Sequence, residues 1–107
     1  MFINYFINKN TNSKNNIPSV VGERTQVTFN VDTRARRADE TIEIRVRNHK
    51  QEAVEVVVRE HLFRAAKNDV VEASQRYERK SSTSVEFPVQ IARDGEAVIT
   101  YRVRYDW

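Results

Sequence analysis

Two runs of alternating apolar residues, separated by a short polar segment, constrain this chain more than any other feature of its sequence. The apolar residues are Ile42, Ile44 and Val46 in the first run and Val54, Val56 and Val58 in the second. Successive side chains of a β-strand point to opposite faces, so each run places one apolar stripe on a core. The polar segment 48–52 has the length of a hairpin loop, so the runs predict an antiparallel pair of strands. The residues expected to face water are Glu43, Arg45, Arg47, Glu55 and Arg59.

The same alternation continues along the chain and predicts two more inward faces, one of Val85, Phe87, Val89 and Ile91 and one of Ala97, Ile99, Tyr101, Val103 and Tyr105. Strands are expected at 25–31, 41–48, 53–60, 69–74, 84–91 and 97–105. Short strands at this spacing are typical of a β-sandwich or barrel. The segment 63–68 lacks alternation and fits either a single helical turn or a loop between sheets.

Two positions in the last third of the chain indicate how its strands are arranged. Asp94-Gly95 predicts a hairpin turn between the last two strands, because glycine takes the positive φ that such a turn needs. Pro88 has no N–H to donate, so its strand is expected to lie at a sheet edge or to contain a bulge. An edge strand in turn invites a partner strand.

Length and composition indicate one folded domain with an arm. The chain has 107 residues, of which 39% are hydrophobic and 31% charged, which fits one globular domain. Residues 1–19 are rich in asparagine, whose side chain competes for backbone hydrogen bonds, so we expect a flexible arm there and a β-sandwich domain over 20–107. Ile3, Tyr5 and Ile7 are expected to form a short strand only if a sheet edge accepts them. The apolar stretch 2–7 is far shorter than the roughly 18 residues of a membrane span, so no span is predicted.

The sequence lacks the residues that most enzymes and metal sites need. It has no cysteine, two histidines and two glycines, so a thiolate site, a zinc site and a glycine-rich phosphate loop are all disfavoured. Its acidic residues alternate with basic ones, which favours cross-strand ion pairs over a catalytic acid pair. We therefore predict a protein that is not an enzyme and has no cofactor, no metal site and no small-molecule substrate.

Arginines form the one charged feature that fits a binding site. The candidate contact residues are Arg34, Arg36, Arg37, Arg45, Arg47, Arg102 and Arg104. Guanidinium groups bind phosphate and carboxylate groups well, so binding of a polyanion or nucleic acid is one interpretation. However, the net charge is only +3, and no exposed aromatic platform interleaves these arginines. A solvated turn and an ion-paired sheet surface are favoured over nucleic-acid binding.

Five short motifs stand in order between residues 42 and 107. They are Val46-Arg47-Asn48-His49-Lys50, then Val56-Val57-Val58-Arg59-Glu60-His61-Leu62, then Val71-Glu72-Ala73-Ser74 followed by Tyr77-Glu78, then Val85-Glu86-Phe87, and finally Asp94-Gly95-Glu96 leading to Tyr101-Arg102-Val103-Arg104-Tyr105. This ordered set resembles the C-terminal domain of unknown function of the mucoidy-inhibitor-A-like bacterial proteins. The resemblance covers about six tenths of the chain.

The resemblance implies an all-β fold, an antiparallel immunoglobulin- or fibronectin-III-like β-sandwich of six to seven strands, at the end of a longer bacterial protein. It transfers no catalytic residue. The chain departs from the family pattern at Ala65-Ala66, where aromatic residues are usual, and in its Asn-rich leader. We therefore expect a fragment or remnant of a larger protein that acts as a noncatalytic interaction or structural module. Its partner is expected to be another protein or a second copy, bound at an edge strand, with polyanion binding as the alternative.

Overall fold

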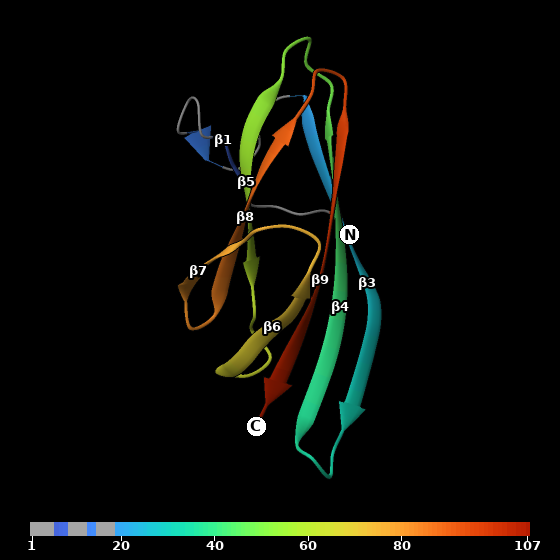
Figure 1. Ribbon diagram of the computed structural model, residues 1–107, viewed down its shortest axis with the longest axis vertical. Coiled ribbons are helices and arrows are strands. Elements are labelled where there is room, and N and C mark those ends of the chain that lie inside the picture. The colour runs from blue at the N-terminus through green and yellow to red at the C-terminus, as the bar shows by residue number, and fades with distance from the viewer. Residues whose placement is uncertain (1–5, 9–12, 15–18) are drawn as a thin grey trace.

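The computed structural model describes residues 6–8, 13–14 and 19–107, which form two antiparallel sheets packed face to face (Figure 1). Seven strands follow residue 19, namely β3 Val20–Asp32, β4 Arg37–Asn48, β5 Val54–His61, β6 Lys67–Ala73, β7 Glu78–Ser81, β8 Ser84–Ile91 and β9 Glu96–Asp106. Two short strands precede them, β1 Phe6–Asn8 and β2 Ser13–Lys14. The all-β sandwich-like fold is thus confirmed. Nowhere in the described ranges is there a helix with the length and hydrophobicity to cross a membrane.

The strands divide between a four-stranded sheet, in the order β3-β4-β9-β6, and a five-stranded sheet, in the order β2-β1-β5-β8-β7. In β1, Ile7 pairs with Val57 of β5, so a sheet edge does accept part of the N-terminal segment. Ile3, Tyr5 and most of the expected arm lie outside the described residues. β9 pairs with β4 as far as Arg37 and Asp106, so the four-stranded sheet keeps its central strands up to the β3–β4 turn. At this end the four-stranded sheet extends past the five-stranded sheet, and the tip of the β3–β4 hairpin projects furthest (Figure 1).

The expected hairpin between the two alternating runs is wrong, because β4 and β5 lie in different sheets. The segment after Asn48 carries the chain from the four-stranded to the five-stranded sheet. Ile44 and Val56 are both fully buried and face the same interior from opposite sides. Alternation therefore identified the buried face of each run correctly, but it did not identify the partner strand.

The turn at Asp94-Gly95 is also a crossing between sheets, since β8 and β9 do not pair. Asp94, and not Gly95, takes the positive φ, at 51°. Glycine is needed for a different reason: a Cβ at Gly95 would lie 2.9 Å from the carbonyl oxygen of Ala92. The Gly95 N–H donates to that same oxygen over 2.9 Å, so the tight approach is part of the turn.

The core is the strip of apolar side chains between the two sheets. The four-stranded sheet contributes Ile42, Ile44, Val46, Ile99, Tyr101, Val103 and Tyr105, and the five-stranded sheet contributes Val54, Val56, Val58, Val85, Phe87, Val89 and Ile91. Phe87 packs against Tyr101, with ring centroids 5.2 Å apart. These residues are the ones that alternation predicted to face inward.

Pro88 lies on a strand that is interior at one end and an edge at the other. β7 pairs with β8 only as far as Glu86, so beyond that point β8 is the local edge. The carbonyl oxygen of Pro88 accepts a hydrogen bond from the Gln75 side chain over 2.7 Å. The backbone N and O of one strand residue point toward the same neighbouring strand, so the position of the missing N–H of Pro88 also faces the side that β7 leaves open. The proline therefore costs the sheet no hydrogen bond. Of the segment 63–68, left open above, residues 63–66 form a loop between sheets, and Lys67 and Asn68 begin β6.

Asn48 ties the two crossing segments together. Its buried Nδ2 lies 2.9 Å from the carbonyl oxygen of Glu52, 3.3 Å from that of Ile91 and 3.1 Å from that of Ala92. Its Oδ1 accepts from the Lys50 N–H over 2.9 Å. A buried carbonyl without a donor is costly, so Asn48 allows both crossings to lie next to the core.

We predict that Asn48→Ala lowers the free energy of unfolding by about 2–3 kcal/mol, because it leaves buried carbonyl groups without a donor. Gln51→Ala, an exposed residue of the same segment, is the matched control and should change it by less than about 0.5 kcal/mol. Urea unfolding followed by circular dichroism measures both. Equal stability of the two variants would contradict this role.

Candidate interaction surfaces

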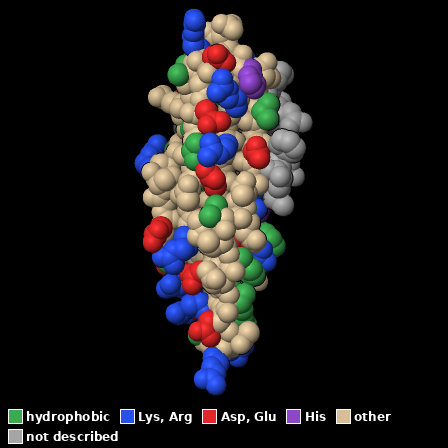
Figure 2. Space-filling view, turned by 90° about the vertical axis from the view of Figure 1, so that its right-hand side faces the viewer, with side chains coloured by type: hydrophobic (Ala, Val, Ile, Leu, Met, Phe, Trp, Pro, Cys, Tyr) green, Lys and Arg blue, Asp and Glu red, His purple; other side chains and the backbone are tan. Residues whose placement is uncertain are grey.

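The outer face of the four-stranded sheet carries most of the predicted arginines. β4 and β9 are neighbours, so Arg45 and Arg47 share this face with Arg102 and Arg104, as the arginine hypothesis requires. Figure 2 views the side on which β3 and β4 lie and shows acidic and basic side chains interspersed along the whole length of the molecule. Both signs of charge are therefore present on this face.

Five of the seven candidate arginines form ion pairs with carboxylates. The pairs are Arg37–Asp106 at 2.9 Å, Arg45–Glu43 at 2.9 Å, Arg45–Glu96 at 3.2 Å, Arg47–Asp94 at 3.3 Å, Arg102–Glu72 at 2.9 Å, Arg102–Asp39 at 3.3 Å and Arg104–Asp39 at 3.1 Å. The hydrogen bond from Arg37 holds the pKa of Asp106 below its usual value. These contacts match the ion-paired sheet surface that the sequence favours, and they neutralise most of the proposed polyanion site.

Arg34 and Arg36 differ from the other five because they lie in the turn at the tip of the β3–β4 hairpin. The turn is held by the Ala35 N–H, which donates to Asp32 Oδ1 over 3.1 Å, and Arg36 has a positive φ of 56°. Both arginines are exposed, and neither forms an ion pair with any residue that the structure describes. The tip therefore presents two guanidinium groups to solvent.

Two buried glutamates, to which the sequence assigned no role, lie between the sheets. Glu60 on β5 is 4% exposed and accepts hydrogen bonds from Arg24 Nε over 2.8 Å and from the Tyr101 hydroxyl over 2.6 Å. Arg24 lies on β3, so this ion pair joins the edge of one sheet to the other. Burial, and then the Glu60 charge, raise the pKa of Tyr101.

Glu40 on β4 is 2% exposed and forms the second buried site. Arg64 donates to both of its carboxylate oxygens, over 3.1 and 3.0 Å, and Gln26 donates over 2.6 Å. The Arg64 guanidinium also lies over the Phe29 ring, 4.3 Å from its centroid. Burial opposes ionisation of Glu40, but the hydrogen bonds from Arg64 and Gln26 outweigh it and lower the pKa. Burial and the Glu40 charge raise the pKa of Tyr105 to about 12.

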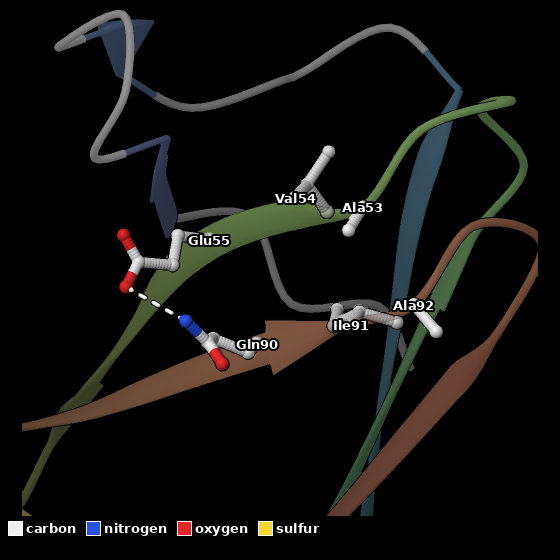
Figure 3. A pocket seen from close by; sticks show the side chains of 6 residues that line it. All are labelled: Ala53, Val54, Glu55, Gln90, Ile91 and Ala92. Carbon is white, nitrogen blue, oxygen red and sulfur yellow. Dashed lines mark hydrogen bonds between the residues drawn. The ribbon is translucent and has the colours of Figure 1, made fainter.

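Both carboxylates between the sheets are thus paired with cations of the same chain, and a third buried glutamate, Glu86, is paired with Arg59. Such pairing suits a structural role better than acid–base chemistry. The hollow in Figure 3 is lined by Ala53, Val54, Glu55, Gln90, Ile91 and Ala92. Glu55 and Gln90 point toward one another there, 3.3 Å apart, and Glu55 is its one titratable side chain. His49 and His61 are both exposed, and the described ranges hold no cluster of His, Asp or Glu suited to a metal ion.

The edge of β3 that faces away from β4, over residues 25–32, is termed the β3 edge. It pairs with no other strand in the part of the chain that the structure describes. Residues 25–31 carry no charge. Val27, Phe29 and Val31 are 52, 40 and 49% exposed. A stretch without charge from residue 25 to 31, with exposed valine and phenylalanine side chains and a neighbouring strand on one side only, is the kind of edge that accepts another strand.

The edges formed by β6, by β7 and by the free part of β8 are protected. β6 carries Lys67, Asp69 and Glu72, and β7 is a four-residue strand with Glu78, Arg79 and Lys80 exposed. The free part of β8 contains Pro88 and is capped by Gln75. Short length, charge and proline all discourage strand addition, so the expected edge for a partner moves from the Pro88 strand to β3.

Comparisons of the chain with protein-family models, with curated proteins and with solved structures found no match. The resemblance to the mucoidy-inhibitor-A-like domain therefore stays a prediction.

We predict that Glu40→Gln makes the chain less stable at pH 7 by about 1–3 kcal/mol, because it removes a charged acceptor from Arg64 and Gln26. The pKa of Glu40 is lower in the folded than in the unfolded chain. Its contribution is therefore fully present above about pH 5 and is lost as the pH falls through the folded pKa. The stability difference between variant and parent should shrink below pH 4.

Urea unfolding between pH 3 and pH 7 measures this difference. Glu52→Gln, at an exposed position, is the control and should follow the parent at every pH. A Glu40→Gln difference that does not change with pH would show that the Glu40 charge is not what stabilises this end of the sandwich.

Proposed function

We propose that this chain is a noncatalytic β-sandwich module that works by protein–protein contact at the β3 edge. The observation that carries the proposal is the exposed, uncharged stretch 25–31 on a strand paired on one side only. An added strand would satisfy the free backbone groups and cover Phe29 and Val31. Support for the absence of catalysis comes from the two glutamates between the sheets, both already paired with arginines.

We also propose an immunoglobulin-like architecture in the broad sense, for which the two packed antiparallel sheets are the support. The strand order does not reproduce the immunoglobulin constant domain in detail. With β3 to β9 lettered A to G, the sheets are A-B-G-D and C-F-E, whereas the constant domain has A-B-E-D and C-F-G. The fifth and seventh strands have exchanged sheets. Membership of the mucoidy-inhibitor-A-like domain family is part of the same proposal.

Polyanion binding is the second candidate, and the exposed tip arginines are the observation that favours it. It has weaker support than strand addition because the other five arginines are ion-paired. Replacing Arg34 and Arg36 by alanine should abolish any retention on heparin and flatten its dependence on salt. Arg45→Ala and Arg47→Ala together form the control. Retention that is unchanged by the tip substitutions would remove this candidate.

Strand addition is tested with a fluorescently labelled peptide of residues 25–32 as the probe strand. We predict that the peptide binds the intact chain and that Val31→Lys weakens binding at least tenfold, because a lysine at the β3 edge opposes pairing. Fluorescence anisotropy measures the affinity.

Val98→Lys is the matched control, because Val98 is a similarly exposed valine, at 43%, on β9, which β4 separates from β3. It should bind the peptide like the parent chain. No binding by the parent, or equal loss in both variants, would mean that the β3 edge does not accept a strand.

A further inference from the structure

We propose that the strand added at the β3 edge is the β3 edge of a second copy of this chain, in an antiparallel pair with a two-fold axis at Asn30. This inference rests on the proposed function, because it names the partner for the same edge. It draws on three features of the described residues: the regular part of β3, the extra length of the four-stranded sheet, and charges at the tip that have no described partner.

The first feature is a regular, self-complementary stretch. A register shift between Gln26 and Thr28 interrupts β3, and from Thr28 to Asp32 its pairing with β4 is regular. With the axis at Asn30, Phe29 lies opposite Val31 of the second copy, and Val31 opposite its Phe29. Both residues are on the inner face of the sheet, since their β4 partners Glu40 and Ala38 are buried. Each copy therefore covers half-exposed apolar side chains of the other.

The second feature is that the four-stranded sheet extends past the five-stranded sheet at the end that carries the β3–β4 turn (Figure 1). Asn30 lies close to the tip of this extension, and the sandwich lies in the opposite direction along β3. In an antiparallel pair the two sandwiches therefore lie at opposite ends of the shared strands and do not collide. The molecule already measures 51 Å along its long axis against 24 and 21 Å across, and the pair would be longer still.

The third feature is charge complementarity. Arg34 and Arg36 follow Asn30 by four and six residues, and Glu23 precedes it by seven. Glu23 is exposed and, like the two arginines, forms no ion pair within the described ranges. In the antiparallel pair the arginine tip of each copy runs beside the stretch of β3 that contains Glu23 of the other. The tip arginines of each copy therefore lie near Glu23 of the other, and the two-fold axis repeats this contact. Charges that have no described partner within one copy find one in the pair.

Site-directed cross-linking tests this geometry directly, because the chain has no cysteine of its own. Asn30→Cys places the two thiols opposite each other at the axis, where Cα atoms about 5 Å apart allow a disulfide or a short bis-maleimide link. Thr25→Cys on the same strand is the matched control. Its two thiols would lie about 33 Å apart, ten residues along the paired strands.

We expect sedimentation equilibrium to show a concentration-dependent dimer of the parent chain, and Asn30→Cys to cross-link at least tenfold faster than Thr25→Cys. Arg34→Glu with Arg36→Glu should weaken the dimer at least tenfold, and adding Glu23→Arg should restore it. Val31→Lys should abolish it, whereas Val98→Lys should not.

Each other result overturns the inference in a distinguishable way. A chain that is monomeric at all concentrations, but still binds the 25–32 peptide, would keep the edge as a strand-addition site for a different protein. A dimer that cross-links equally at positions 25 and 30 would use another face. Growth beyond the dimer would exclude a closed two-fold pair. A monomer that also fails to bind the peptide would remove the proposed function itself.

Discussion

The whole structure depends on one strip of apolar side chains closed between two sheets. The alternation around Ile44 and around Val56 supplies the two sides of that strip, and burying both sides requires the chain to cross from one sheet to the other. Crossing places backbone carbonyl groups beside the core. Asn48 makes this possible, because its fully buried amide group, with two N–H donors, lies within hydrogen-bonding distance of three of them.

The two sheets differ in length, and the difference explains the unusual end of the molecule. β3 and β4 have 13 and 12 residues, whereas β5 and β8 have 8 each. Near Glu40 the five-stranded sheet no longer packs on the four-stranded sheet. The loop that carries Arg64 packs on the inner face there instead. A charged cover suits a buried carboxylate, but it leaves Phe29 and Val31 half-exposed beside a free edge.

Sequence patterns predicted the faces of the strands but not their partners. Period-two alternation is local, so the inward residues of β4, β8 and β9 were predicted correctly. Strand pairing depends on residues far apart in the sequence, and the two predicted hairpins, one across the segment 48–52 and one at Asp94-Gly95, were both wrong. β7 was missed because all four of its residues are exposed and show no alternation. The sequence did not predict the free β3 edge either. The start of β3 at Val20 and its pairing with β4 alone depend on how the whole sheet assembles, which no local pattern shows.

The central claim is that the β3 edge is open in the single chain and is covered on association. Amide hydrogen exchange at residues 25–32, measured over a range of protein concentrations, tests it most directly. The account predicts that the amides pointing away from β4 exchange freely in dilute solution and become protected as the concentration rises. Strong protection of those amides at the lowest concentration, where chains are single, would contradict it, because the edge would then be covered by the chain itself.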